Sequence, residues 1–261
     1  MDLGIRGRKA IVCASSKGLG RGVAIALARE GVDLVINGRN REVLEATATA
    51  IRAESKVNVI AITADVTTEV GRNAVLAACP DPDILINNAG GPPPGDFRNV
   101  DRDGWLEAID ANMLTPIFLA KATIDRMIAR RFGRIINITS AGVKAPGALP
   151  TLAISVGARA GLTGFMGVLS RQVAQHNVTI NGVLPGRFDT DRLRSVIDHE
   201  SKATGRPASD IATGQETAIP ARRFGTVEEF GAITAFLCSG HAGYITGQNL
   251  MLDGGMFPGF A

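Results

Sequence analysis

The chain has 261 residues, of which 45% are hydrophobic and 20% are charged, enough apolar material for one large core. Its formal charge is only +3, and no basic run is interleaved with aromatics as a nucleic-acid groove requires, so we expect no nucleic-acid partner. The N-terminal segment lacks the apolar core of a signal peptide and no stretch reaches spanning length, which predicts a cytoplasmic protein without a membrane partner.

Short apolar runs recur along the chain, with segments of helical periodicity between them. The runs cover residues 9–14, 33–37, 57–63, 84–87, 134–138 and 178–184. Such alternation predicts a parallel sheet covered by helices on both faces. Segments 20–30 and 42–54 place apolar residues at steps of three and four, the period of a helix packed on a sheet. We therefore predict one α/β domain over 1–261, a Rossmann-type doubly wound parallel sheet.

The first predicted strand leads through a glycine-containing turn into a helical pattern. The turn is Ala14-Ser15-Ser16-Lys17-Gly18-Leu19-Gly20. Glycines let a phosphate approach the backbone at a helix N-terminus, where free N–H groups and the helix dipole favour an anion. The full G-x-G-x-x-G pattern is absent, because Val23 stands where the third glycine is expected. The strand–turn–helix context still predicts a dinucleotide pyrophosphate here.

The second predicted strand ends next to Arg39, at the spacing where the adenosine ribose of a dinucleotide would lie. An acid at this place would bind the 2'-hydroxyl of NAD, whereas Arg39 and Lys17 suit the 2'-phosphate of NADP. We therefore expect NADP as the cofactor, with NAD possible. Arg39 as an ordinary solvated residue is the alternative interpretation.

The segment 187–220 departs from the alternating pattern. It is polar and helix-prone, and Gly205, Pro207 and Gly214 interrupt it. This composition is typical of a mobile cap on the substrate side of a site. It is equally typical of a surface excursion, so both interpretations stay open.

Metal chemistry is not indicated anywhere in the chain. Cys13, Cys79 and Cys238 lie far apart, without CxxC or histidine spacing, which argues against a zinc site and a disulfide framework. The three histidines, at positions 176, 199 and 241, are isolated, and we interpret them as structural or solvated.

Further motifs, taken in order, resemble the short-chain dehydrogenase/reductase family over nearly the whole chain, most closely its 3-oxoacyl-carrier-protein-reductase-like members. The turn 13–20 resembles the family's TGxxxGxG, with Cys13 and Ala14 in its first two places, and 87–90 matches its NNAG motif letter for letter. Segment 243–247 with 253–255 matches the family's C-terminal strand region. Beyond the turn and Arg39, the resemblance implies cofactor contacts at Asp65, Val66, Asn88, Ala89, Gly90, Arg159, Pro185, Gly186 and Thr190.

The resemblance also implies four catalytic positions. Asn112 falls where the family has an asparagine that kinks a helix and holds a water, and Ser140 falls on the serine that binds the substrate carbonyl. In the family's Tyr-x-x-x-Lys motif the ammonium lowers the pKa of the phenol. Here Ser155 aligns with the tyrosine and Arg159 with the lysine. Serine is a weaker acid on a shorter side chain, and arginine, with a pKa above 12, cannot shuttle a proton near neutrality.

Two functions remain open at this point. The chain is either a weak or unusual reductase of a small-molecule carbonyl substrate, with the proton supplied through Ser140, Asn112 and Lys144, or a silent dinucleotide-binding sensor or partner subunit. The first is preferred, because the matches at Ser140, Pro185 and Gly186 persist.

Self-association is expected from the helix predicted over 154–175. Its glycines, at positions 157, 161, 164 and 167, suggest that another backbone packs close to it. Family members assemble through this helix, so the resemblance implies a homotetramer. Tyr244, the chain's only tyrosine, is expected to pack or to bridge subunits rather than to catalyse.

Overall fold

Seven parallel strands form one sheet in the computed structural model, which describes residues 1–148 and 150–259. The strand order is β3-β2-β1-β4-β5-β6-β7. The strands are β1 (Lys9–Val12), β2 (Asp33–Gly38), β3 (Val59–Thr63), β4 (Ile84–Asn87), β5 (Gly133–Ile138), β6 (Val178–Pro185) and β7 (Asn249–Leu252). The Rossmann-type doubly wound sheet predicted from the sequence is confirmed.

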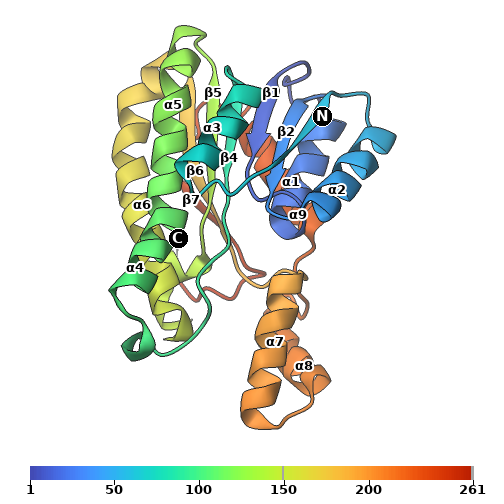
Figure 1. The fold of residues 1–261 in the computed structure, drawn as a ribbon. Coiled ribbons are helices and arrows are strands. Elements are labelled where there is room, and N and C mark those ends of the chain that lie inside the picture. The colour runs from blue at the N-terminus through green and yellow to red at the C-terminus, as the bar shows by residue number, and fades with distance from the viewer. Residues whose placement is uncertain (149, 260–261) are drawn as a thin grey trace.

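Helices cover both faces of this sheet (Figure 1). They are α1 (Gly18–Arg29), α2 (Arg41–Glu54), α3 (Glu69–Ala78), α4 (Arg102–Ile109), α5 (Thr115–Ala129), α6 (Ala153–Val173), α7 (Asp191–Thr204), α8 (Ala208–Ala218) and α9 (Val227–Leu237). A π-helical segment, Asp110–Leu114, joins α4 to α5. Successive side chains of a strand point to opposite faces, so Val12 of β1 packs with α1, α2 and α9, while Ile11 packs with α3, α5 and α6.

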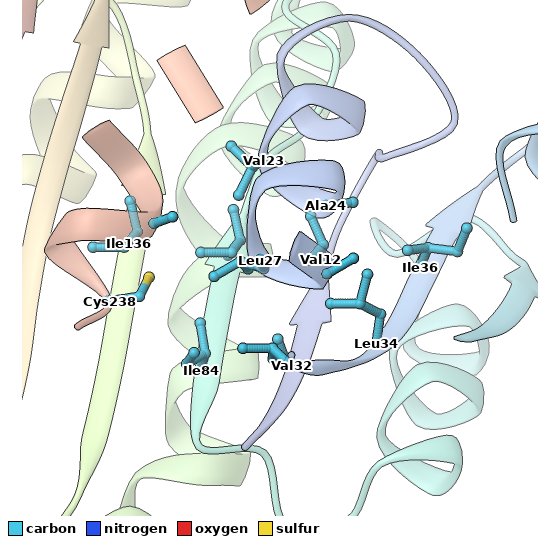
Figure 2. Packing of buried hydrophobic residues seen from close by; sticks show 14 of the residues in the cluster. Val12, Val23, Ala24, Leu27, Val32, Leu34, Ile36, Ile84, Ile136 and Cys238 are labelled. Carbon is cyan, nitrogen blue, oxygen red and sulfur yellow. The ribbon is translucent and has the colours of Figure 1, made fainter. Parts of the chain in front are cut away.

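The core on the α1 side is shown in Figure 2, where Leu27 lies over Val12 and Ile84, with Leu34 beside them. These side chains are essentially excluded from water. Burying one such aliphatic side chain is worth about 1.5–3 kcal/mol. The packing of β1, α1 and β2 therefore gives the glycine turn between β1 and α1 a rigid base.

β2, β5 and β6 each extend one residue beyond the predicted run, and three other strands differ more from the prediction. β1 ends at Val12 because Cys13 and Ala14 already belong to the turn, with Ala14 at φ 46. β3 begins at Val59, two residues later than predicted. β7 carries no buried apolar run, since it is an edge strand whose residues are only partly buried or exposed. Only the resemblance of the C-terminal motif had indicated it.

Helices α1 and α9 touch backbone to backbone at Gly22 and Gly231. A Cβ on Gly22 would overlap the carbonyl oxygen of Val227, and a Cβ on Gly231 would overlap that of Gly22. Backbone atoms inside packed helices cannot swing aside, so only glycine fits at either place. The comparison with the G-x-G-x-x-G pattern noted Val23 in the third glycine position but overlooked Gly22, one residue earlier, which packs against α9.

We expect Gly231→Ala to lower the free energy of unfolding by about 1–3 kcal/mol, because it overpacks this contact. Urea unfolding followed by circular dichroism measures the change. The matched control is Gly214→Ala in α8, where a Cβ meets nothing within 4 Å, and which should gain up to about 1 kcal/mol from helix propensity. A Gly231→Ala variant as stable as the parent would contradict the close contact.

Segment 187–220 is largely helical, as expected, and forms α7 and α8. The two helices lie side by side, away from the sheet (Figure 1, orange). α7 begins after Thr190, whose side chain accepts a hydrogen bond from the N–H of Leu193, and ends at Gly205 with φ 72. The lobe is attached at the carboxyl end of β6.

One helix among the described residues, Ala153–His176, is long and apolar enough to cross a membrane by length and composition. The expectation that no stretch reaches spanning length is wrong by that measure. In this structure, however, Leu162, Met166 and Val173 of the helix pack into the core beside the sheet. A core helix of a soluble protein passes the same test, so the finding is weak evidence for a membrane.

Candidate dinucleotide and substrate site

The candidate residues gather at the carboxyl edge of the sheet. The strand order reverses direction between β1 and β4, and open α/β sheets bind ligands outside the carboxyl ends of the strands at such a point. The segments that leave β1, β2, β4, β5 and β6 at this edge carry the glycine turn, Arg39, Asn88–Gly90, Ser140 and Pro185–Thr190. The topology thus brings residues from five parts of the sequence to one edge.

The glycine turn is held in a fixed shape by buried hydrogen bonds. The Ser15 hydroxyl donates to Val12 O at 2.7 Å and accepts from Asn37 N at 3.0 Å. Asn88 Nδ2 donates to Ala14 O at 3.2 Å, which ties the NNAG segment to the turn. A Cβ on Gly20 would overlap Ala14 O, so glycine is required for this approach.

The N-terminus of α1 differs from those of its neighbours. It begins after Lys17, with no capping side chain and no acid in the first turn. The two helices packed beside it, α2 and α9, are capped by Asn40 and Thr226, whereas α1 shares the lack of a capping side chain with α5, α6 and α8. The first N–H groups of α1 therefore remain available to an anion. A dinucleotide pyrophosphate fits this place.

The segment after β6 lies against the turn. A Cβ built on Gly18 would be 3.8 Å from Thr190 Cγ2, and Lys17 Nζ lies 3.4 Å from Asp191 Oδ2. Gly186 N donates to Leu252 O at 2.8 Å, which fixes the chain after Pro185 beside β7. The residues expected over the nicotinamide are thus close to those expected around the pyrophosphate.

Arg39, expected at the 2'-phosphate, lies beside Asp65, expected at the adenine. Its side chain is 79% exposed, and Nη1 is 3.8 Å from Asp65 Oδ2. Asp65 Oδ1 accepts from the backbone and the hydroxyl of Thr67, while Val66 is buried. An exposed guanidinium at this edge can rotate to an incoming phosphate without breaking a buried contact.

Ser140 and Asn112 occupy different surroundings. Ser140 Oγ accepts from Gly142 N at 3.2 Å, and its proton has no acceptor among the described residues. Asn112 is buried in the π-helical segment, where its Nδ2 donates to Ala108 O at 3.1 Å. A π-helical turn is a common cause of a helix kink, and this is the irregularity expected at Asn112. Its water remains a prediction.

Ser155 and Arg159 lie one turn apart on α6, and their side chains are hydrogen-bonded to each other. Arg159 Nη1 donates to Ser155 Oγ, and both side chains are buried. Burial, together with the nearby charge of Arg192, lowers the pKa of Arg159 to about 10. The expected pKa above 12 is therefore too high, although the guanidinium stays charged at neutral pH.

The structure bears on two further expectations, the packing of Tyr244 and the close approach of another backbone to the glycines of α6. Tyr244 is fully exposed, so it does not pack within the chain. The glycines of α6 meet side chains rather than another backbone within the chain: Gly157 faces the Trp105 ring and Gly161 faces Met113 Sδ. A Cβ on Gly164 would meet nothing within 4 Å.

The cysteines and histidines form no common site in the described part of the chain. All three cysteines are free and buried, and burial raises the pKa of Cys13 and of Cys238 to about 12, which leaves both thiols unreactive. His199 and His241 are exposed and His176 is half-buried. No group of three possible metal ligands occurs among these residues.

The fold and the residues at the carboxyl edge of the sheet define a dinucleotide-binding α/β protein. Comparisons with known proteins identify its family. A family model described as Enoyl-(Acyl carrier protein) reductase matches residues 13–257. The 3-oxoacyl-[acyl-carrier-protein] reductase FabG of Escherichia coli is 31% identical, over 98% of this chain and 99% of that protein. The NADPH-dependent reductase BacG of Bacillus subtilis is 32% identical, over 95% and 97%.

The crystal structure of L-sorbose reductase from Gluconobacter frateurii, complexed with NADPH and L-sorbose, superimposes with a TM-score of 0.93. It is 28% identical in sequence, and all of both chains is covered. The chain belongs to the short-chain dehydrogenase/reductase family, the family of NAD(P)-dependent oxidoreductases that its motifs indicated.

Proposed function

We propose that this protein is an NADP(H)-dependent reductase of a small-molecule carbonyl compound, with atypical proton supply because Ser155 and Arg159 occupy the tyrosine and lysine positions. One observation carries the proposal. The uncapped N-terminus of α1, Asn88 and Thr190 lie close together at the carboxyl edge of the sheet, where the strand order reverses between β1 and β4. The NADPH named for the Bacillus and Gluconobacter relatives supports the choice of cofactor.

The cofactor would lie along the carboxyl edge. The backbone at Gly18, Leu19 and Gly20 would hold the pyrophosphate, with Ala14 and Ser16 shaping the turn. Lys17 and Arg39 would hold the 2'-phosphate, while Asp65 and Val66 would border the adenine. The nicotinamide half would lie among Asn88, Ala89, Gly90, Arg159, Pro185, Gly186 and Thr190. When bound, the cofactor supplies the hydride.

Proton supply falls to groups other than a phenol. The Ser140 hydroxyl can donate to the substrate carbonyl oxygen, since its proton has no acceptor among the described residues. Water near Asn112, with Lys144 close to Ser140 in sequence, would replace the proton. Ser155 is unsuited, because its side chain is short and weakly acidic. Losing a well-placed general acid typically slows a reaction about 10² to 10⁴-fold, which reduces turnover without abolishing it.

The direct test combines binding with turnover. NADPH is titrated into the protein by calorimetry, and a panel of ketones, aldehydes and acyl thioesters is assayed for NADPH oxidation. Slow, protein-dependent oxidation supports the proposal. Absence of heat with either pyridine coenzyme, from well-folded protein, contradicts it.

A non-catalytic sensor or partner subunit is the second candidate. Two observations favour it. Ser155 Oγ already accepts a hydrogen bond from Arg159, and the chain's only tyrosine, Tyr244, lies in an exposed loop before β7. This candidate predicts tight NADPH binding with no ketone reduced above background. The same assay therefore distinguishes the two.

Arg39→Ala should weaken NADPH binding about 10–100-fold, because a charge-assisted contact to the 2'-phosphate is lost. Binding of NADH should change little, since NADH lacks that phosphate. Calorimetry with both coenzymes measures the difference. A loss of equal size for NADPH and NADH would place Arg39 elsewhere than at the 2'-phosphate.

A homotetramer in the cytoplasm is part of this proposal. Phe118 on α5, with Phe165 and Val168 on α6, are exposed large apolar side chains, which supports burial between subunits. Multi-angle light scattering should give four times the chain mass of 27.3 kDa. A monomer at micromolar concentration contradicts it.

The α7–α8 lobe is proposed as the substrate-side cap.

A further inference from the structure

Arg159 is a buried cation with no counter-ion among the residues that the structure describes. The residue is 8% exposed, and the only acceptors of its side chain among the described residues are the hydroxyl and carbonyl oxygens of Ser155, both reached from Nη1. Nη2 and Nε donate to no group in residues 1–148 and 150–259. Burying a charge is unfavourable unless it is paired and hydrogen-bonded. The remaining donors therefore suit an acceptor from outside the chain.

Arg134 shows how this fold treats a buried arginine with a purely structural role. It is 1% exposed, and all three of its guanidinium nitrogens donate. The acceptors are the carbonyl oxygens of Gly133, Asn177 and Ser239 and the side-chain oxygen of Asn177. The guanidinium of Arg159 lacks a comparable set of acceptors among the described residues, so a purely structural role does not explain its burial.

A second guanidinium borders the same loop. Arg192 Nη2 donates to Pro92 O at 2.9 Å, and a Cβ on the preceding residue, Gly91, would lie 3.3 Å from Arg159 Nη2. The two cations thus flank adjoining residues after β4. Arg192 also stands in the first turn of α7, where the helix dipole disfavours a cation.

The acids on the nearby segment have other partners. Asp189 pairs with Arg194, and Asp191 pairs with Lys17 and with Arg194. Neither Arg159 nor Arg192 forms an ion pair within the described residues. Two guanidinium groups beside one loop are thus left for an anion.

We propose that Arg159 and Arg192 bind a carboxylate of the substrate, which makes the substrate class oxo acids and the corresponding hydroxy acids. The planar N–H fork of arginine matches a carboxylate in shape and charge. This inference rests on the proposed function. The reaction is then oxo acid plus NADPH and a proton, giving hydroxy acid plus NADP⁺. Arg159 has five donors, so a contact with the nicotinamide ribose leaves others for the substrate.

The first experiment compares acids with their neutral esters. NADPH oxidation is measured with 2-oxobutanoate, 3-oxobutanoate and 4-oxopentanoate and with the methyl ester of each. We expect at least one acid to exceed its ester about 10-fold or more in kcat/KM, the usual effect of a charge-assisted contact. Arg192→Ala should remove this preference by lowering kcat/KM for the acid alone. Arg194→Ala, on the same helix but paired with Asp189, is the control and should keep the preference.

A second readout does not depend on turnover. The chain's only tryptophan, Trp105, lies against Gly157 of α6, between Ser155 and Arg159 in sequence, so its fluorescence reports on this place. In the presence of NADP⁺, titration with 4-oxopentanoate should change the signal, and Arg192→Ala or Arg159→Met should weaken the response about 10-fold or more. The methyl ester should give little response.

The outcomes separate the two proposals. Reduction of esters as fast as acids overturns the carboxylate site and leaves the reductase function standing. Arg192-dependent carboxylate binding without reduction of any ketone supports the site and contradicts the function. A loss of NADPH affinity in Arg192→Ala as large as its loss for the acid would assign Arg192 to the cofactor phosphates, which also overturns the inference.

Discussion

The double variant Ser155→Tyr, Arg159→Lys should reduce neutral ketones about 10² to 10⁴-fold faster than the parent, since it restores a phenol beside an ammonium. A neutral ketone is used so that loss of Arg159 does not weaken substrate binding. Ser155 is buried and Gly91 lies beside it, with a Cβ on Gly91 only 3.6 Å from Ser155 Oγ, so the segment after β4 must shift to admit the ring. Steady-state oxidation of NADPH measures the gain.

The control for this gain is Ser155→Phe, Arg159→Lys, which has the same ring without the hydroxyl. It should stay near the parental rate. Equal rates for the tyrosine and phenylalanine variants, or no gain in a folded, NADPH-binding double variant, would contradict the assignment of the catalytic positions.

Gly20→Ala should weaken NADPH binding about 100-fold or more. The new Cβ would overlap Ala14 O and press on Asn88 Nδ2, so the turn must open and several contacts to the pyrophosphate are lost together. Calorimetry gives the dissociation constant, and circular dichroism shows whether the variant is folded. Gly214→Ala, far away on α8, should bind NADPH as the parent does. Unchanged affinity in Gly20→Ala would place the pyrophosphate elsewhere.

The fold was predictable because apolar runs and helical periods are local properties of the sequence. The central strands are buried on both faces, and their apolar runs gave their positions within two residues at each end. β7 was missed because its apolar run, at 250–252, is only three residues long and shorter than the runs that marked the other strands. Gly22 was overlooked as a packing residue because its partner, Gly231, is distant in sequence.

The candidate site was predictable in composition but not in its contacts. The turn, Asn88 and Thr190 come together because their segments leave one edge of one sheet. The bond between Ser155 and Arg159 follows from their four-residue spacing on a helix. The position of Arg192 beside Pro92 could not be foreseen, since the 100 residues that separate them include α4, α5, α6 and two strands.

The glycine-to-glycine contact of α1 with α9 also bears on how the chain matures. Roughly 200 residues must be synthesised between the two helices, which takes about 10–40 seconds at usual translation rates. Throughout that time the groove of α1 that receives α9 stays open to solvent and to other nascent chains. Truncations that end before residue 227 should therefore aggregate or recruit chaperones, although they contain the entire nucleotide-binding turn.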